Sequence, residues 1–144
     1  MDTLFIVGET GLRRGGTFWR HKTHQNGLSV DIFVPLRDQD GTSVNVPTWP
    51  WDLFGYGLEL DEAGHAGPLT IDFDALAELL HELRVQIEKH RLKIQRVILY
   101  PPYIPLLLKT VHGAMLGPIQ PSFMRTRAWV RHDEHVHIDF LPRE

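Results

Sequence analysis

Two histidine clusters at opposite ends of the chain constrain its fold more than any other feature. Five of the nine histidines lie in two short stretches, one with His21 and His24 and the other with His132, His135 and His137. The imidazole side chain is the commonest metal ligand in proteins. A metal site that uses both clusters therefore requires a fold that brings the two ends of the chain together.

Two segments with the alternating pattern of a β-strand carry the second cluster and an aspartate that follows the first. In 28–34, apolar side chains at every second position predict a core face, which leaves Asp31 on the opposite face. In 135–140, the same alternation places His135, His137 and Asp139 opposite the core face. If the two strands are neighbours in one sheet, we expect Asp31 and His137 to lie side by side.

Together with His24, these two residues provide the donor atoms of a zinc site. His24 lies just before the Asn26-Gly27 turn, from which it can reach Asp31 and His137. The chain has no cysteine, so His, Asp or Glu must hold any zinc ion. Two nitrogens and one carboxylate oxygen leave a fourth position for water, which is typical of a catalytic site rather than a structural one. The pattern thus predicts a single zinc ion as the cofactor.

The other clustered histidines then have candidate roles. His135 lies two residues from His137 on the same face and could transfer protons near the metal ion. His132 could stabilise an oxyanion, and His21 could orient His24 without binding the metal. The alternative is that a histidine is an ordinary surface residue, which is our interpretation of the other four: His65, His81, His90 and His112. A structural or transport metal site is a further alternative.

The rest of the pattern predicts one α+β domain over residues 1–144. Its clearest element is a helix from Phe73 to about His90, with Asp72 as N-cap and apolar residues at three- and four-residue steps. Further expected elements are a strand at 4–7, a glycine-rich loop at 8–16, a long surface excursion at 36–71, a strand at 95–100 and a short helix at 104–112. We therefore expect a small central antiparallel sheet that carries the zinc site, with one long helix and a shorter helix packed on it.

Composition and charge narrow the class of protein. With 144 residues and 42% hydrophobic residues, the chain can bury a core of ordinary size. A formal net charge of −3 gives no electrostatic case for nucleic acid as a partner. No apolar run reaches the ~20 residues that span a bilayer, and the apolar stretch at 4–7 is too short for the core of a signal peptide. The oligomeric state is left open.

Two motifs resemble those of a known peptidase family. The segment 21–31, HKTHQNGLSVD, resembles the first motif of the penicillin-insensitive murein endopeptidases. This family belongs to a wider group with lysostaphin-type peptidases, D-Ala-D-Ala metallopeptidases and the hedgehog signalling domain. Arg127-Ala128-Trp129 followed by HDEHVH at 132–137 resembles the second motif, and Gly15-Gly16-Thr17-Phe18 upstream of the first also fits.

The resemblance implies a zinc-dependent D,D-endopeptidase that cleaves the D-alanyl–meso-diaminopimelyl cross-links of peptidoglycan, with peptidoglycan stem peptides as partners. It implies His24, Asp31 and His137 as zinc ligands, and His132 and His135 as catalytic histidines. It also implies insensitivity to β-lactams, because such an enzyme has no serine nucleophile to acylate. The implied place of action is the cell envelope, in the periplasm or at the cell wall.

Two other functions stay open beside the endopeptidase. One is a D,D-carboxypeptidase, or a phage- or effector-type cell-wall amide hydrolase, that uses the same site. The other is a non-catalytic metal-binding interaction module, although intact His132 and His135 favour an enzyme. The excursion at 36–71 offers Trp49, Trp51 and Tyr56 as substrate contacts, but aromatic residues in a loop also serve to anchor it to the core.

Overall fold

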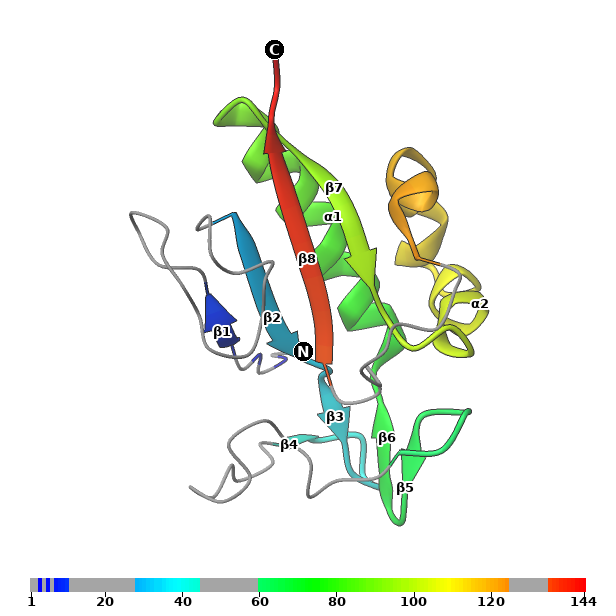
Figure 1. Ribbon diagram of the computed structural model, residues 1–144. Coiled ribbons are helices and arrows are strands. Elements are labelled where there is room, and N and C mark those ends of the chain that lie inside the picture. Colours follow the sequence, from blue (N-terminus) through cyan, green and yellow to red (C-terminus); the bar gives the residue numbers. More distant parts are fainter. Residues whose placement is uncertain (1–2, 4, 6, 11–27, 45–59, 125–134) are drawn as a thin grey trace.

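The computed structural model describes residues 3, 5, 7–10, 28–44, 60–124 and 135–144. In this part of the chain the fold is α+β, with two small antiparallel sheets, one long helix and shorter helical segments (Figure 1). This confirms the predicted α+β class, with two small sheets where one central sheet was predicted.

The first sheet brings the two histidine-bearing ends of the chain together. Its strands, in spatial order, are β1 (Val7–Thr10), β2 (Ser29–Phe33), β8 (His135–Pro142) and β7 (Leu92–Ile98), and all neighbours are antiparallel. Figure 1 shows the C-terminal strand β8 inside the sheet, between β2 and β7. The two strands predicted to carry the site are therefore direct neighbours.

The first strand begins later than the sequence predicts. β1 spans Val7–Thr10, and Phe5 of the predicted strand lies outside it. The strand contains Gly8, which the pattern assigns to a loop. The pairing of β1 with β2 is irregular between Val7 and Thr10. A glycine inside a strand often marks such a bulge, because it has no side chain to pack. Here backbone pairing with β2 overrides the loop preference of glycine.

The second sheet lies within residues 36–71, where the sequence predicts a long surface excursion. Its strands, in spatial order, are β4 (Ser43–Val44), β3 (Leu36–Arg37), β6 (Leu69–Ile71) and β5 (His65–Ala66). The prediction of an irregular segment at 36–71 is wrong for these strands. Strands of two or three residues are too short to display an alternating period, so the pattern does not reveal them.

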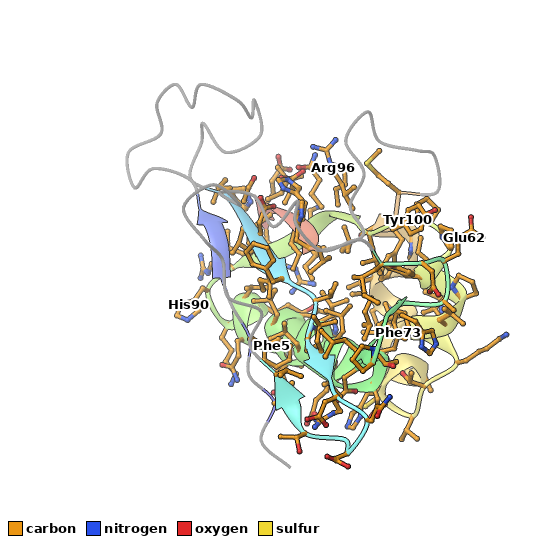
Figure 2. All side chains as sticks on the ribbon, turned by 90° about the horizontal axis from the view of Figure 1, so that it is seen from below. Phe5, Glu62, Phe73, His90, Arg96 and Tyr100 are labelled. Atoms are coloured by element: carbon orange, nitrogen blue, oxygen red, sulfur yellow. The ribbon has the colours of Figure 1, made fainter. Side chains whose placement is uncertain are left out.

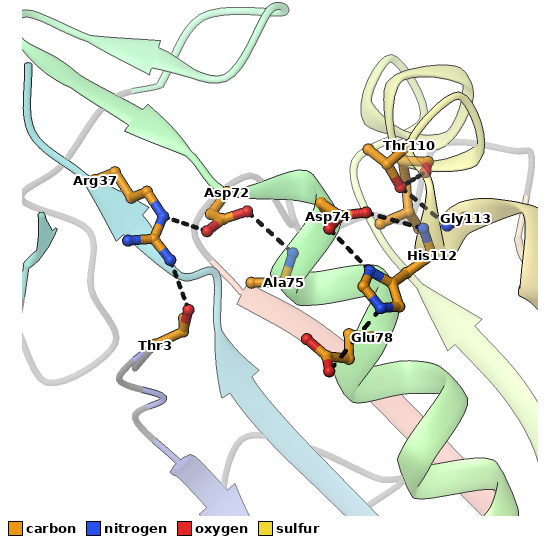
Figure 3. Close-up of polar contacts among 10 residues, drawn as sticks. Thr3, Arg37, Asp72, Asp74, Ala75, Glu78, Thr110, His112 and Gly113 are labelled. Atoms are coloured by element: carbon orange, nitrogen blue, oxygen red, sulfur yellow. Dashed lines mark hydrogen bonds and ion pairs between the residues drawn. The ribbon is translucent and has the colours of Figure 1, made fainter. Parts of the chain in front are cut away.

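The long helix α1 spans Phe73–Lys89 and confirms the predicted helix. The carboxylate of Asp72 caps it by accepting a hydrogen bond of 3.0 Å from the backbone N–H of Ala75. The same carboxylate is ion-paired with Arg37, which ties the start of α1 to β3 (Figure 3). The apolar stripe of α1 is buried through Leu76, Leu80 and Ile87.

Two shorter helical segments follow β7. The helix α2 spans Tyr103–Leu108, and a 3₁₀ helix, η2, spans His112–Ser122. The predicted helix at 104–112 is therefore too long at its C-terminal end. Just after α2, the hydroxyl of Thr110 donates to the carbonyl of Leu107 and accepts from the backbone N–H of Gly113, and the chain then continues in 3₁₀ turns. None of the helices in the described part of the chain is long and apolar enough to cross a membrane.

The core lies between α1 and one face of the first sheet (Figure 1). On that face Val136 of β8 is opposite Ile32 of β2, and Ile138 is opposite Val30. Val136, Ile138 and Ile32 are buried, and Val30 packs against the same cluster. The predicted core face of both strands is thus confirmed, and the alternate positions lie on the other face of the sheet.

Candidate functional site

The candidate site lies on the face of the first sheet opposite the core. Across the β2–β8 pair, Asp31 is opposite His137, Ser29 is opposite Asp139, and Phe33 is opposite His135. This register confirms the expectation that Asp31 and His137 lie side by side. Asp31, His137 and Asp139 are only 7%, 4% and 4% exposed, so these charged groups lie in a desolvated environment.

The imidazole of His137 lies between two carboxylates. Its Nδ1 is 2.7 Å from Asp31 Oδ1, and its Nε2 is 2.7 Å from Asp139 Oδ1. Burial alone would lower the pKa of His137, but the hydrogen bonds and charges of Asp139 and Asp31 outweigh it and raise the pKa to about 9. In the metal-free protein at neutral pH, His137 is therefore an imidazolium that donates a hydrogen bond to each carboxylate.

The carboxylate of Asp139 accepts hydrogen bonds from three side chains. Besides His137, Ser29 donates from Oγ to Oδ1 at 2.6 Å, and Arg96 donates from Nε to Oδ2 at 2.7 Å. Burial alone would raise the pKa of Asp139, but the hydrogen bonds from His137, Ser29 and Arg96 lower it to about 2. Asp139 is therefore ionised throughout the physiological range, and its position is fixed from both neighbouring strands.

An irregularity in β7 places Arg96 on this face. Ile94 is opposite Phe140, whereas Arg96 is opposite Asp139, so β7 advances two residues while β8 advances one. Such a bulge shifts the following side chains by one face. Gln95 is the extra residue, and Arg96 consequently meets Asp139. Seen from below in Figure 2, Arg96 lies on the side of the first sheet away from α1.

His135 also lies on this face of the sheet. It is half-buried, and its ring packs against Phe33 at a centroid distance of 6.3 Å. Because side chains two residues apart on a strand share a face, His135 lies roughly 7 Å along the strand from His137. At that separation both imidazoles can contact one small group bound between them, which suits a proton-transfer role for His135.

Several predicted site residues lie outside the described residues: His21, His24, His132, Trp49, Trp51 and Tyr56. Their predicted roles stay predictions: His21 to orient His24, His24 to bind the metal ion, His132 to act in catalysis, and the three aromatic residues to contact substrate. Within the described residues, no group of three or more His, Asp or Glu side chains could hold a metal ion by itself. A metal site on this face thus needs a further ligand, and His24 is the predicted one.

The donor chemistry of the described pair fits zinc. A carboxylate oxygen and an imidazole nitrogen are both common zinc ligands, and the two atoms already lie next to each other. Histidines that bind metal usually donate their other ring N–H to a carboxylate, as the Nε2 of His137 does towards Asp139. Binding of the metal ion would displace the Nδ1 proton that now lies between His137 and Asp31.

Sequence reasoning placed Asp139 on the correct face but gave it no role, and it missed Ser29 and Arg96. Strand parity was a sufficient signal for Ser29, which lies two residues before Asp31 on the same face. Arg96 had no such signal, because the bulge that redirects it is not visible in the pattern of β7.

No protein-family model matches the chain, and a search of curated proteins finds no significant match. The assignment of a function to this face therefore depends on its residues and their chemistry.

Proposed function

We propose that this chain is a zinc-dependent D,D-endopeptidase that hydrolyses the D-alanyl–meso-diaminopimelyl cross-links of peptidoglycan. The observation that carries the proposal is the pairing of Asp31 with His137 on a buried, polar sheet face that also presents His135. An adjacent carboxylate and imidazole, with a second imidazole two residues away, combine metal ligands with a group that can transfer protons. The motif resemblance supplies the substrate class.

In this proposal His24, Asp31 and His137 hold one zinc ion. When bound, zinc acts as a Lewis acid that polarises the scissile carbonyl and lowers the pKa of a water molecule. Asp31 and Asp139 neutralise positive charge at the site, and their burial strengthens this electrostatic interaction. The pairing of β2 with β8 holds Asp31 and His137 opposite each other, which limits the reorganisation needed on binding.

The remaining histidines have the proton-transfer and charge-stabilising roles. His135 accepts the proton of the attacking water and returns it to the leaving amine of the cross-link. His132 donates a hydrogen bond to the oxyanion, and His21 orients His24. The partners are peptidoglycan stem peptides, which Trp49, Trp51 and Tyr56 contact, and the place of action is the cell envelope. A β-lactam would not inhibit this reaction, because no serine is acylated.

One observation favours a second candidate, a non-catalytic module. Both nitrogens of His137 have carboxylate partners, and the charges of Asp31, His137, Asp139 and Arg96 balance without a metal ion. The same polar network could thus serve only to fix the pairing of β2, β8 and β7, or to hold a metal ion without catalysis.

Incubation with purified muropeptide dimers, with and without a chelator, separates these candidates. The endopeptidase converts dimers to monomers, loses activity with chelator and regains it with added zinc. Release of terminal D-Ala alone indicates a carboxypeptidase at the same site. A protein with a full zinc complement and no turnover on dimers or monomers is the non-catalytic module. His90→Ala, at an exposed position just after α1, is a matched histidine control that should retain full turnover.

A further inference from the structure

We propose that Asp139 is the positioning residue of this site: it holds the Nε2 side of the His137 ring, so that Nδ1 faces Asp31 and is the nitrogen offered to a metal ion. This inference rests on the proposed zinc site and assigns a role to a residue that the motif resemblance leaves out.

The two ring nitrogens of His137 have matching contacts. One carboxylate lies 2.7 Å from each ring nitrogen, Asp31 at Nδ1 and Asp139 at Nε2. A metal ion replaces the proton on one nitrogen only, and the other nitrogen keeps its N–H. The two carboxylates therefore have different roles, one as a fellow ligand and the other as the acceptor of the remaining N–H.

The environment of Asp139 identifies it as the acceptor. Its Oδ1 also accepts a hydrogen bond from Ser29 at 2.6 Å, and its Oδ2 accepts one from Arg96 at 2.7 Å. These donors come from β2 and β7, the strands on either side of β8. To bind a metal ion, Asp139 would have to give up hydrogen bonds inside a buried environment, which is costly. Asp139 therefore stays with its donors and orients the ring.

The backbone makes this arrangement rigid. Asp139 follows His137 by two residues on β8, so both side chains are on the same face by strand geometry. Ser29 lies opposite Asp139 in the β2–β8 register, and the bulge in β7 brings Arg96 opposite it from the other side. Three strands thus fix one carboxylate, and the carboxylate fixes one imidazole.

The chemical consequence is a more basic and pre-oriented ligand. A carboxylate on the far nitrogen increases the electron density at the ligating nitrogen and prevents rotation of the ring. Loss of such an outer partner typically weakens metal binding by about 10–100-fold. We expect that loss when Asp139 no longer accepts the hydrogen bond from His137.

The test compares Asp139→Asn with Asp72→Asn in the full chain. Asp72 is also ion-paired with an arginine, but it caps α1 and is not part of the site. Zinc affinity, measured by competition with a chromophoric chelator, should fall about 10–100-fold in Asp139→Asn. It should stay at the wild-type value in folded Asp72→Asn. Thermal unfolding of both variants identifies the temperature range in which each is folded.

Nitrogen-15 NMR of the zinc-loaded protein gives a readout that a loss of stability would not change. In the wild type, His137 should show a zinc-bound Nδ1 and a protonated Nε2. In Asp139→Asn, the Nε2–H signal should broaden or shift because its charged acceptor is gone. Unchanged zinc affinity together with an unchanged His137 spectrum in Asp139→Asn overturns the inference, and so does a wild-type spectrum with zinc on Nε2.

A second variant keeps the inference testable if Asp139→Asn does not fold. Ser29→Ala leaves the carboxylate in place but removes one of its three donors. We expect a loss of zinc affinity of about tenfold or less, with the same His137 nitrogen bound; no loss at all contradicts the inference.

The experiments distinguish failure of the proposed endopeptidase from failure of the role of Asp139. A wild type that binds zinc through Nδ1 but does not cleave muropeptides contradicts the endopeptidase alone, and the role of Asp139 stands. A wild type that binds no zinc contradicts both proposals.

Discussion

Asp31 Oδ1 lies 2.7 Å from His137 Nδ1, although 106 residues separate the two in the chain. The antiparallel pairing of β2 with β8 makes this contact, because the register places the two residues directly opposite each other. Both side chains are buried, so their interaction takes place at low dielectric, where an unpaired charge is costly. The predictions for His137 and His135 depend on this pair.

Replacement of His137 by alanine should remove zinc binding and destabilise the protein. The variant loses a proposed metal ligand and leaves Asp31 and Asp139 buried without their shared cation. Removal of one partner from a buried ion pair typically costs about 3–5 kcal/mol of unfolding free energy. Zinc content after gel filtration and urea unfolding of the metal-free protein measure the two effects. His90→Ala is the control, and a His137→Ala protein that keeps stoichiometric zinc contradicts the assignment of His137 as a ligand.

Replacement of His135 by alanine should separate catalysis from metal binding. This half-buried residue is assigned to proton transfer rather than to the metal ion, so zinc content should be unchanged. Turnover of muropeptide dimers should fall about 10²–10⁴-fold, as expected for a general acid–base residue. Steady-state rates and zinc content are measured on the same preparation. If the variant also releases zinc, the roles of His135 and His137 are assigned incorrectly.

The contact between Asp74 and His112 should make stability depend on pH. The backbone N–H of His112 donates to Asp74 Oδ1 at 2.9 Å, and Nδ1 lies 2.8 Å from Asp74 Oδ2 (Figure 3). The hydrogen bond with Asp74 raises the pKa of His112 above 6.5, with a smaller contribution from Glu78 at 3.9 Å. Hydrogen bonds from the backbone and side chain of His112 lower the pKa of Asp74 below 3.8.

The sign of the pH effect follows from these directions. The raised pKa of His112 contributes stability that is complete below pH 6.5 and is lost as the pH rises through the folded-state pKa. The lowered pKa of Asp74 contributes stability that is present above pH 3.8 and is lost as the pH falls through its folded-state pKa. The difference in Tm between wild type and His112→Gln should thus be largest between about pH 4 and 6.5 and should shrink towards pH 8. A pH-independent difference contradicts this prediction.

Replacement of Gly113 by alanine should disrupt the junction between α2 and η2. An added Cβ would overlap the carbonyl oxygen of Leu107 and lie 2.9 Å from Leu108 Cα. Both are backbone atoms, which cannot move aside as a flexible side chain can. We therefore expect the free energy of unfolding to fall by about 3 kcal/mol. Ala114→Ser, at the next and exposed position, should change stability by about 0.5 kcal/mol or less. Chemical unfolding of the two variants provides the comparison, and equal stabilities would show that the junction can relax.

Long elements with a clear period could be predicted from the sequence. The helix α1 shows its apolar stripe over 17 residues, and Asp72 marks its start. The strand β8 shows its alternation through Val136, Ile138 and Phe140. Short elements could not be predicted, because the strands of the second sheet have two or three residues and depend on partners that lie elsewhere in the chain.

Only part of the candidate site could be predicted from the sequence. Asp31, His135 and His137 were placed on the correct face, because parity along a strand is a local property. Arg96 could not be placed, since the bulge in β7 reverses its expected face. The role of Asp139 also needed the structure, because it depends on donors from both adjacent strands.

By itself the sequence determined which polar side chains share a face, since alternate residues of an extended strand point to opposite sides in any fold. Only the tertiary structure decided which of them meet. A shift of two residues between β2 and β8 would preserve parity and yet place Asp31 opposite His135 or Asp139 instead of His137. Register, bulges and shared hydrogen bonds arise from contacts between distant segments, and no local pattern encodes them.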